Sequence, residues 1–382
     1  MDQAESKIRV LVVDDSAVMR KIIISALEKE TSIEVIGFAT NGLQAIDSVR
    51  NLKPDVLTLD IEMPVMDGLT ALKEIRKENR FLPIIMFSTL THKGAQAAVM
   101  ALTAGASDYV GKPTTSAGSI EGAFKVLETE LIPKIIGLSR RARLRKPPSV
   151  RQNEASGTPS PSIVERNQYA SPHSVTKQEA RTSLPVRPAT AVCIGVSTGG
   201  PMALMQVFGK FSASLKVPVF IVQHMPPTFT ALLAARLSAT SLMTVKEGED
   251  GEVAVPGMAY IAPGGFHMVL SKSGINTIIN LNTDPPENSC RPAVDPLFRS
   301  AADIYGSNLL GVVLTGMGYD GLKGAQVIKS KFGQVVAQDE ETSVIWGMPG
   351  AIVQAGIADS VLPIDKIADE IAFRTRRVEV SR

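Results

Sequence analysis

A serine, a threonine and two glycines follow the end of a run of apolar residues. The stretch AVCIGVSTGG, residues 191–200, predicts a buried strand that leads into a tight turn at Ser197. A turn of this kind can present a serine hydroxyl to a substrate, and residues 195–199 fit the G-x-S-x-G pattern of a nucleophile elbow. The glycines could instead cradle a phosphate group. The stretch alone therefore allows either nucleophilic catalysis or nucleotide binding.

Two more polar residues follow apolar runs in the same half of the chain. His224 ends VPVFIVQH, and Asp320 lies in MGYDG, after LLGVVLTG. Because the carboxyl ends of parallel strands meet at one edge of a sheet, we expect these side chains beside Ser197. There Ser197 would attack a carbonyl carbon, His224 would take the hydroxyl proton, and Asp320 would orient the imidazole. Backbone N–H groups of the TGMGYDG loop could stabilise the oxyanion.

Other residues could take the same roles. The usual α/β-hydrolase order of serine, acid and histidine would need an acid before His267, such as Asp250. His267 is therefore an alternative base, rated below His224 because its strand is expected to belong to a hairpin. Cys290 is disfavoured as a nucleophile because no histidine lies near it in sequence.

A nucleotide site is the second hypothesis. GMGYDG, residues 316–321, fits G-x-G-x-x-G between a strand pattern and a helix pattern, and Asp339 follows close to the spacing of about 20 residues expected for a ribose-binding acid. Asp320 argues against it, because a carboxylate at a helix N-terminus competes with a pyrophosphate for the same N–H groups. A non-catalytic interaction module is the third hypothesis.

A separate set of polar residues follows the expected strands of the N-terminal part. The set comprises Asp14, Asp15, Asp60, Ser88 and Lys112. Three carboxylates at one point favour a hard cation such as Mg²⁺. A lysine and a serine beside them can contact phosphoryl oxygens, so the chemistry indicated is phosphorylation of a carboxylate. Single residues of this kind are common turn formers, but five at successive strand ends are not explained by turns alone.

Parallel sheets are needed to bring these residues together. The alternation of strand and helix patterns predicts an α/β protein with two doubly wound parallel-sheet domains joined by a linker. The expected divisions are a domain over residues 7–125, a helical extension and Pro/Ser-rich linker over 126–188, and a domain over 189–376. Within the last, GMAYIAPGGFHMVL predicts a hairpin or mixed-sheet excursion.

Composition excludes several classes of protein. The net charge of +2 over 382 residues implies no strong attraction to nucleic acid. The start MDQAESKIRV lacks the apolar core of a secretory signal, and we expect no membrane insertion because no apolar run approaches the length of a span. Only two cysteines occur, which favours a reducing, cytoplasmic location over a disulfide scaffold.

The N-terminal domain resembles a response-regulator receiver domain of the flavodoxin-like fold. The motifs that carry the resemblance are VLVVDDS, DVLTLDIEMPVMDG, MFST and DYVGKP. The resemblance implies that Asp60 is the phosphoacceptor and that a chemotaxis histidine kinase is the phosphodonor. It also implies Mg²⁺ bound by Asp15, Asp60 and the backbone carbonyl of Glu62 with help from Asp14, and a phosphoryl group contacted by Ser88 and Lys112.

The C-terminal domain is similar to the Rossmann-like catalytic domain of chemotaxis protein-glutamate methylesterases. The motifs are GVSTGGP, VFIVQHMP, AYIAPGGFHM, RPAVDPLF, LTGMGYDG and IWGMPGAI. The resemblance implies a catalytic triad of Ser197, His224 and Asp320, an oxyanion donor at the backbone N–H of Met317, and no cofactor for the esterase reaction. The implied reaction is hydrolysis of glutamate γ-methyl esters on methyl-accepting chemoreceptors with release of methanol, and deamidation of receptor glutamines is a second activity to consider.

A receiver joined to an enzyme predicts regulation by phosphorylation. In the resting form the receiver is expected to lie against the edge that carries Ser197 and to obstruct the receptor. Phosphorylation of Asp60 would reshape the face near Ser88 and weaken that contact.

Overall fold

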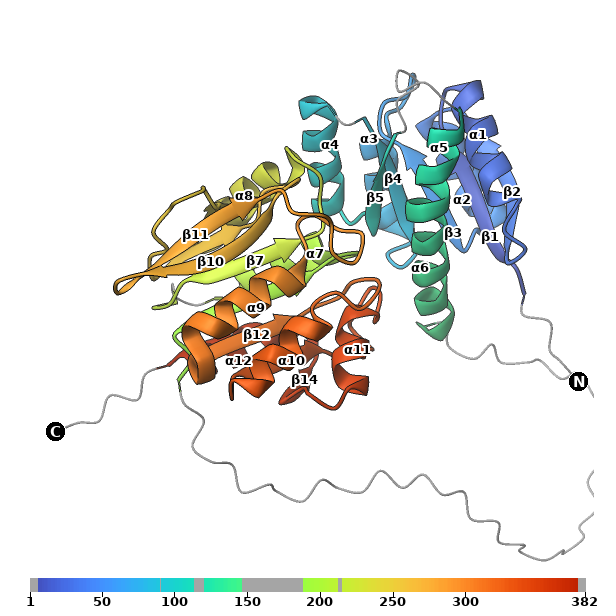
Figure 1. The fold of residues 1–382 in the computed structure, drawn as a ribbon. Helices are drawn as coiled ribbons and strands as arrows, with labels where there is room; N and C mark the ends of the chain where they lie inside the picture. Colours follow the sequence, from blue (N-terminus) through green and yellow to red (C-terminus); the bar gives the residue numbers. More distant parts are fainter. Residues whose placement is uncertain (1–5, 90, 113–119, 146–187, 212–214, 377–382) are drawn as a thin grey trace, which may run out of the picture.

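The computed structural model describes residues 6–89, 91–112, 120–145, 188–211 and 215–376. The predicted linker over 146–188 lies outside these residues except for its last position. The described chain forms two α/β domains, coloured blue to green and yellow-green to red in Figure 1. Within those ranges no helix is long and apolar enough to cross a bilayer.

The N-terminal domain is built on five parallel strands in the order β2-β1-β3-β4-β5, the order of flavodoxin-like folds. Nearly all residues of β1, β3 and β4 are buried, as expected when helices cover both faces of a parallel sheet. The strands are β1 (Ile8–Val13), β2 (Ile33–Ala39), β3 (Val56–Asp60), β4 (Ile84–Ser88) and β5 (Asp108–Gly111), and the first four helices are α1 (Ala17–Leu27), α2 (Gly42–Leu52), α3 (Gly68–Glu78) and α4 (His92–Thr103). Ser16 is the N-cap of α1, and its side chain accepts from Met19 N–H at 3.3 Å.

A long helical segment closes this domain. It runs through α5 (Ile120–Val126), a π-helical turn η2 (Leu127–Leu131) and α6 (Ile132–Arg145). Lys134 of this segment donates to the carbonyl of Tyr109 in β5 at 2.7 Å and pairs with Asp108 at 3.3 Å. The segment is therefore fixed to the edge strand of the N-terminal sheet.

The C-terminal domain is built on seven parallel strands in the order β14-β13-β12-β6-β7-β9-β8. Helices α7, α8 and α12 pack on one face of this sheet, and α9, α10 and α11 pack on the other. The strands are β6 (Ala191–Val196), β7 (Val219–Gln223), β8 (Thr244–Glu247), β9 (Met258–Ile261), β12 (Leu309–Val313), β13 (Gln334–Gln338) and β14 (Ser360–Leu362), and the helices are α7 (Gly200–Gly209), α8 (Phe229–Thr240), α9 (Val294–Tyr305), α10 (Leu322–Ser330), α11 (Met348–Gln354) and α12 (Ile364–Thr375).

The strand order reverses between β6 and β12. From β6 the chain adds β7, β8 and β9 on one side, and β12, β13 and β14 form the other side. Ligands of open α/β sheets bind beyond the carboxyl ends of the strands at such a switch point. Ser197 follows β6 directly, and the loop that holds Asp320 follows β12.

The predicted excursion over GMAYIAPGGFHMVL is correct for its second half, which enters a hairpin at His267, and wrong for its first half. MAYI forms β9, which pairs parallel with β7 and β8 inside the main sheet. The antiparallel hairpin consists of β10 (His267–Ser273) and β11 (Asn276–Asn282). The sequence pattern fails here because an excursion and a central parallel strand are equally apolar, and only long-range pairing separates them.

Candidate active site and acidic pocket

Ser197 lies in a turn that is fixed on both sides. Its N–H donates to Thr315 O at 3.0 Å, in the loop after β12. Its carbonyl accepts from Gly200 N–H at 2.8 Å and from Gln223 Nε2, at the end of β7, at 3.0 Å. Ser197 is half-buried, whereas Thr198 beside it is buried, so the turn presents the serine toward the surface.

Close packing accounts for the two glycines after the serine. Gly199 has φ of 76°, and a Cβ there would lie 2.5 Å from Val344. A Cβ on Gly200 would lie 1.9 Å from Gln223 Oε1. The Gly200 N–H is already bonded to Ser197 O, so this amide is not free to hold a phosphate.

His224 and Asp320 form a close pair at the same edge. His224 follows β7, and its Nε2 lies 2.8 Å from Asp320 Oδ2. Asp320 also accepts from the N–H groups of Val294 and Asp295, at 2.7 and 3.1 Å, and from Asn288 Nδ2 at 2.9 Å. Val294 and Asp295 begin α9, so the carboxylate lies at the positive end of that helix dipole.

The amides that a dinucleotide would need are already occupied. Asp295 accepts from Gly324 N–H in the first turn of α10 at 2.7 Å, and Asp320 accepts from Gly321 N–H at 2.9 Å. Asp339, the suggested ribose-binding acid, accepts from Thr342 N–H at 2.9 Å within its own turn. Two carboxylates at the start of α10 leave no favourable place for a pyrophosphate, which counts against the nucleotide hypothesis.

The contacts of Asp320 and His224 shift the pKa of each residue and so set their protonation states. Burial opposes ionisation of Asp320, but the hydrogen bonds from His224 and from backbone amides outweigh it and hold the pKa of Asp320 below its usual value. Burial also acts to lower the pKa of His224, but hydrogen bonds to Asp320 and Cys290 outweigh it and raise that pKa to about 9. Because an ionised Asp320 only accepts, Nε2 of His224 carries a proton and Nδ1 is the nitrogen left for base chemistry.

Nδ1 of His224 faces Cys290 rather than Ser197. Cys290 Sγ lies 3.5 Å from Nδ1, whereas Ser197 Oγ makes no hydrogen bond within the part of the chain that the structure describes. The backbones of the two strand ends are adjacent, because His224 N–H donates to Val196 O at 3.2 Å. The carboxyl edge of the sheet thus brings all three predicted residues together. His224 and Asp320 are hydrogen-bonded there, whereas the described residues show no hydrogen bond between Ser197 Oγ and His224.

A histidine lies beside Cys290 in space although none lies near it in sequence, so that ground for disfavouring Cys290 is wrong. Cys290 and Asn288 come from the segment between β11 and α9, and the sheet topology delivers His224 to them from β7. Sequence reasoning missed Asn288 and considered Cys290 only as a disfavoured nucleophile. The available signal was their position just before RPAVDPLF, whose helix start receives Asp320.

The backbone N–H of Met317 is available beside the serine. Gly316 holds the loop by donating to Ile345 O at 3.0 Å and by accepting from Met348 N–H at 2.8 Å. A Cβ on Gly316 would lie 2.8 Å from Ser197 Cβ, so the loop touches the serine. Among the residues with described positions, none accepts a hydrogen bond from Met317 N–H.

The alternative base and acid have other partners. His267 is buried, its Nδ1 accepts from Ala293 N–H at 3.2 Å, and its Nε2 lies 3.2 Å from Pro285 O. Asp250 accepts from Leu281 N–H at 2.8 Å and so fixes the hairpin. Both ring nitrogens of His267 are engaged, which agrees with rating it below His224.

The N-terminal domain carries an acidic pocket at the carboxyl ends of β1 and β3. Asp14, Asp15 and Asp60 each place a carboxylate oxygen within 4.8 Å of the others. Lys112 Nζ lies 2.6 Å from Asp60 Oδ2 and 3.4 Å from Asp14 Oδ2. Asp14 Oδ2 is buried and makes no hydrogen bond to the described residues.

Burial makes this pocket unfavourable for negative charge. It raises the pKa of Asp60 to about 6, with Lys112 acting in the opposite direction and Asp14 adding to the rise. Burial likewise raises the pKa of Asp14 above its usual value. A divalent cation would relieve both carboxylates, so the donor set fits Mg²⁺.

Ser88 and Glu62 have contacts of their own. Ser88 Oγ donates to Gly94 O of α4 at 2.7 Å rather than to Asp60. Glu62 N–H donates to Asp60 Oδ1 at 3.3 Å. The structure thus brings Lys112 onto Asp60 but connects the Ser88 hydroxyl to α4.

The two domains share a hydrophobic contact. Helix α4 packs against α7 and α8 (Figure 1). The rings of Tyr109 and Phe229 stack with centroids 4.7 Å apart. Val344 packs against the core of the N-terminal domain, and its side chain is also the nearest to a Cβ built on Gly199. The N-terminal domain therefore contacts a segment that touches the Ser197 turn.

Comparisons with known proteins agree with this architecture. Residues 192–371 match the CheB methylesterase model, and residues 10–121 match the response regulator receiver domain model. The protein-glutamate methylesterase/protein-glutamine glutaminase of Trichodesmium erythraeum is 46% identical over 96% of this chain and 99% of its own. The protein of the same name from Pyrococcus abyssi is 41% identical over 98% of this chain and 95% of its own.

Solved structures match the two halves separately. The Thermotoga maritima CheB methylesterase catalytic domain is 45% identical with a TM-score of 0.48, and covers 48% of this chain and 98% of that one. The response regulator domain of Thermotoga maritima CheB is 42% identical with a TM-score of 0.32, and covers 37% of this chain and 99% of that one. With relatives alike over nearly their whole length, the chain belongs to the CheB methylesterase family, in the form that carries an N-terminal response-regulator receiver domain.

Proposed function

We propose that this protein is a phosphorylation-activated serine hydrolase that demethylates glutamate γ-methyl esters of chemoreceptors in chemotaxis adaptation. The observation that carries the proposal is the hydrogen-bonded pair of His224 and Asp320 at the sheet edge that also holds Ser197. Relatives named protein-glutamate methylesterase/protein-glutamine glutaminase support the substrate class.

The residues divide the reaction between them. Ser197 Oγ attacks the ester carbonyl carbon as its proton passes to His224 Nδ1, and Asp320 stabilises the imidazolium. The backbone N–H of Met317 donates to the oxyanion. His224 then returns the proton to the methoxy oxygen, methanol leaves, and water hydrolyses the acyl-serine by the same proton route. The same acyl-serine formed from a glutamine side chain would release ammonia, which makes deamidation a second activity of one site.

Methanol release tests this function directly. Full-length protein mixed with methyl-labelled chemoreceptor should release labelled methanol, and addition of Mg²⁺ with a small phosphodonor should raise the rate. Receptor labelled on the same glutamates but incubated without the protein is the control. No methanol above that control, under either condition, would contradict the proposal.

In the receiver, Asp60 accepts the phosphoryl group from a chemotaxis histidine kinase. Asp14, Asp15, Asp60 and the Glu62 carbonyl would hold Mg²⁺, which neutralises charge on the phosphoryl group during transfer. Lys112, which already contacts Asp60, would pair with a phosphoryl oxygen. Ser88 would have to leave the Gly94 carbonyl to reach the same group, which would alter its contact with α4.

We expect Asp60→Asn to abolish phosphorylation, because the amide is a poor nucleophile and leaves the pocket one charge short for Mg²⁺. The measurement is incorporation of label from radiolabelled acetyl phosphate with Mg²⁺, and chelation of Mg²⁺ should give the same loss in the unaltered chain. Asp47→Asn is a matched control, since Asp47 is exposed on α2. Undiminished labelling of the Asp60→Asn chain would place the phosphoacceptor elsewhere.

The resting receiver restrains the esterase in this proposal. Contacts at Tyr109, Phe229 and Val344 support it, because the last of these also touches the turn after Ser197. An aromatic stack contributes about 0.5–1.5 kcal/mol beyond its buried area, so a local change at α4 can shift the balance between packed and open arrangements.

A truncated chain of residues 188–382 should therefore be more active than the unphosphorylated full chain. An increase of about tenfold is expected where the packed form is favoured by about 1.4 kcal/mol. The measurement is the initial rate of methanol release at equal protein concentration. The phosphorylated full chain serves as control and should approach the truncated one, whereas equal rates without phosphorylation would reject restraint by the receiver.

A further inference from the structure

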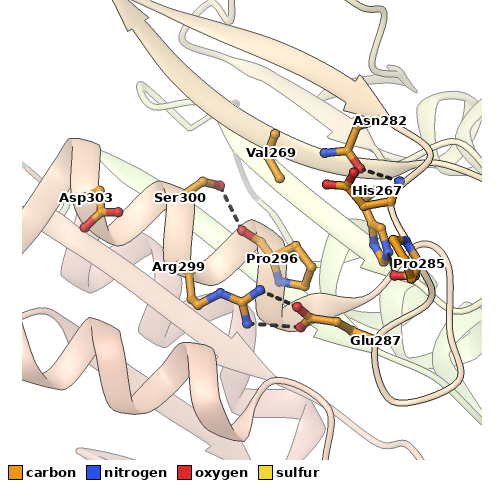
Figure 2. Close-up of a pocket in the computed structure, with 10 residues that line it drawn as sticks. His267, Val269, Asn282, Pro285, Glu287, Pro296, Arg299, Ser300 and Asp303 are labelled. Atoms are coloured by element: carbon orange, nitrogen blue, oxygen red, sulfur yellow. Dashed lines mark hydrogen bonds and ion pairs between the residues drawn. The ribbon is translucent and has the colours of Figure 1, made fainter.

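The segment between β11 and α9 contacts both members of the pair of His224 and Asp320. Asn288 Nδ2 donates to Asp320 Oδ1 at 2.9 Å, and Cys290 Sγ lies 3.5 Å from His224 Nδ1. Figure 2 shows how the segment is anchored: Glu287 pairs with Arg299 of α9, at the side of a cavity of about 280 Å³. Cys290 is therefore held near the imidazole by contacts outside the catalytic edge.

The thiol occupies the nitrogen that base catalysis needs. Asp320 accepts the Nε2 proton, so a neutral His224 has one free lone pair, on Nδ1. Nδ1 has room for one hydrogen-bond partner at a time: it donates when the ring is protonated and accepts when the ring is neutral. In the described chain Nδ1 faces the Cys290 sulfur, and Ser197 Oγ makes no hydrogen bond to any residue of known position. Cys290 and Ser197 thus exclude each other as partners of Nδ1.

We propose that Cys290 is a positioning residue that competes with Ser197 for Nδ1 of His224 and holds the imidazole in a resting orientation until substrate binds. The inference rests on the proposed esterase function. Release of the thiol lets the ring meet the serine hydroxyl, and no covalent change of Cys290 is involved.

The charges around His224 predict how the pH profile responds. Asp320 lies against Nε2 of His224. Asp295 and Arg299 of α9 are close enough to Asp320 to interact with it electrostatically. Burial opposes protonation of His224, while Asp320 and Cys290 together raise its pKa to about 9. At pH 7 the ring is then mostly protonated and cannot act as base. In the protonated ring the Cys290 sulfur accepts from Nδ1–H, which stabilises the imidazolium. Removal of this acceptor lowers the pKa of His224, so more of the ring is neutral at pH 7 and the rise in activity moves to lower pH.

The first test compares pH–rate profiles of the full chain with a peptide that contains a glutamate γ-methyl ester. Cys290→Ala should raise kcat/KM at pH 7 by about 3- to 10-fold, the range expected for loss of one competing hydrogen bond. Its profile midpoint should move to lower pH, and Cys290→Ser should fall between it and the unaltered chain. Ser289→Ala, at the exposed neighbour, should match the unaltered chain. A lower rate at every pH with an unmoved midpoint would make Cys290 merely structural and overturn the proposal.

The second test measures the contact between Cys290 and His224 in a way that does not depend on catalysis. In chains that carry Ser197→Ala, NMR titration of the His224 ring should give a lower pKa when Cys290→Ala is added. An unchanged titration would overturn the competition even if the esterase is active. A shifted titration in a protein whose unaltered form releases no methanol would overturn the esterase function, and the competition with it. Activity that survives Ser197→Ala but is lost in Cys290→Ala would make the thiol the nucleophile and reject both proposals.

Discussion

Ser197→Ala should lower kcat for methanol release by about 10⁴- to 10⁶-fold, as loss of the nucleophile does in other triads. Alanine keeps the turn, because the contacts that fix it run through the Ser197 backbone N–H and carbonyl. Only the attacking oxygen is removed, and the residual rate would come from Met317 N–H and substrate binding. The measurement is steady-state methanol release from methyl-labelled receptor, and kcat is calculated with the total protein concentration as the concentration of active sites.

Ser330→Ala, at the end of α10, is a matched control that removes a serine hydroxyl distant in the chain from this turn. Phosphorylation of Asp60 in the Ser197→Ala chain should remain normal and would show that the fold is intact. Turnover within tenfold of the unaltered protein would exclude a serine nucleophile at this position.

The sheet logic explains why much of this site could be predicted from sequence. Apolar runs that end in a polar residue identified Ser197, His224 and Asp320, and the parallel strands β6, β7 and β12 bring them to one edge. The same logic brought Asp14, Asp60 and Lys112 together in the receiver, where the three are in contact. Such predictions work because a parallel sheet converts strand order into spatial order at its carboxyl edge.

The features that sequence could not predict depend on side-chain direction and long-range pairing. Ser88 ends its strand as expected, but its hydroxyl donates to Gly94 of α4, a choice of rotamer that no pattern encodes. Cys290 reaches His224 only because the segment before α9 folds over the edge from outside the sheet. The sequence predicts a hairpin or mixed-sheet excursion where β9 lies, because the pairing of β9 with β7 and β8 links residues about 40 and 14 positions apart and leaves no local pattern.

His224→Ala should lower kcat almost as far as Ser197→Ala, and Asp320→Asn somewhat less. His224 is the only residue of the described edge that pairs with Asp320 and can take the serine proton. The amide introduced by Asp320→Asn would keep an acceptor for part of the α9 N-terminus, but it would not stabilise an imidazolium, and its N–H₂ group would favour the wrong imidazole tautomer. Steady-state kinetics of each single variant with labelled receptor give the two losses.

The double variant Ser197→Ala/His224→Ala decides whether these residues act as one unit. If His224 works only by activating Ser197, its removal costs nothing further once the hydroxyl is gone, and the double variant should be no slower than Ser197→Ala alone. Thermal unfolding of all three chains controls for stability. Losses that multiply would mean that His224 acts on the substrate by a route independent of Ser197, and the shared proton path from hydroxyl to imidazole would have to be abandoned.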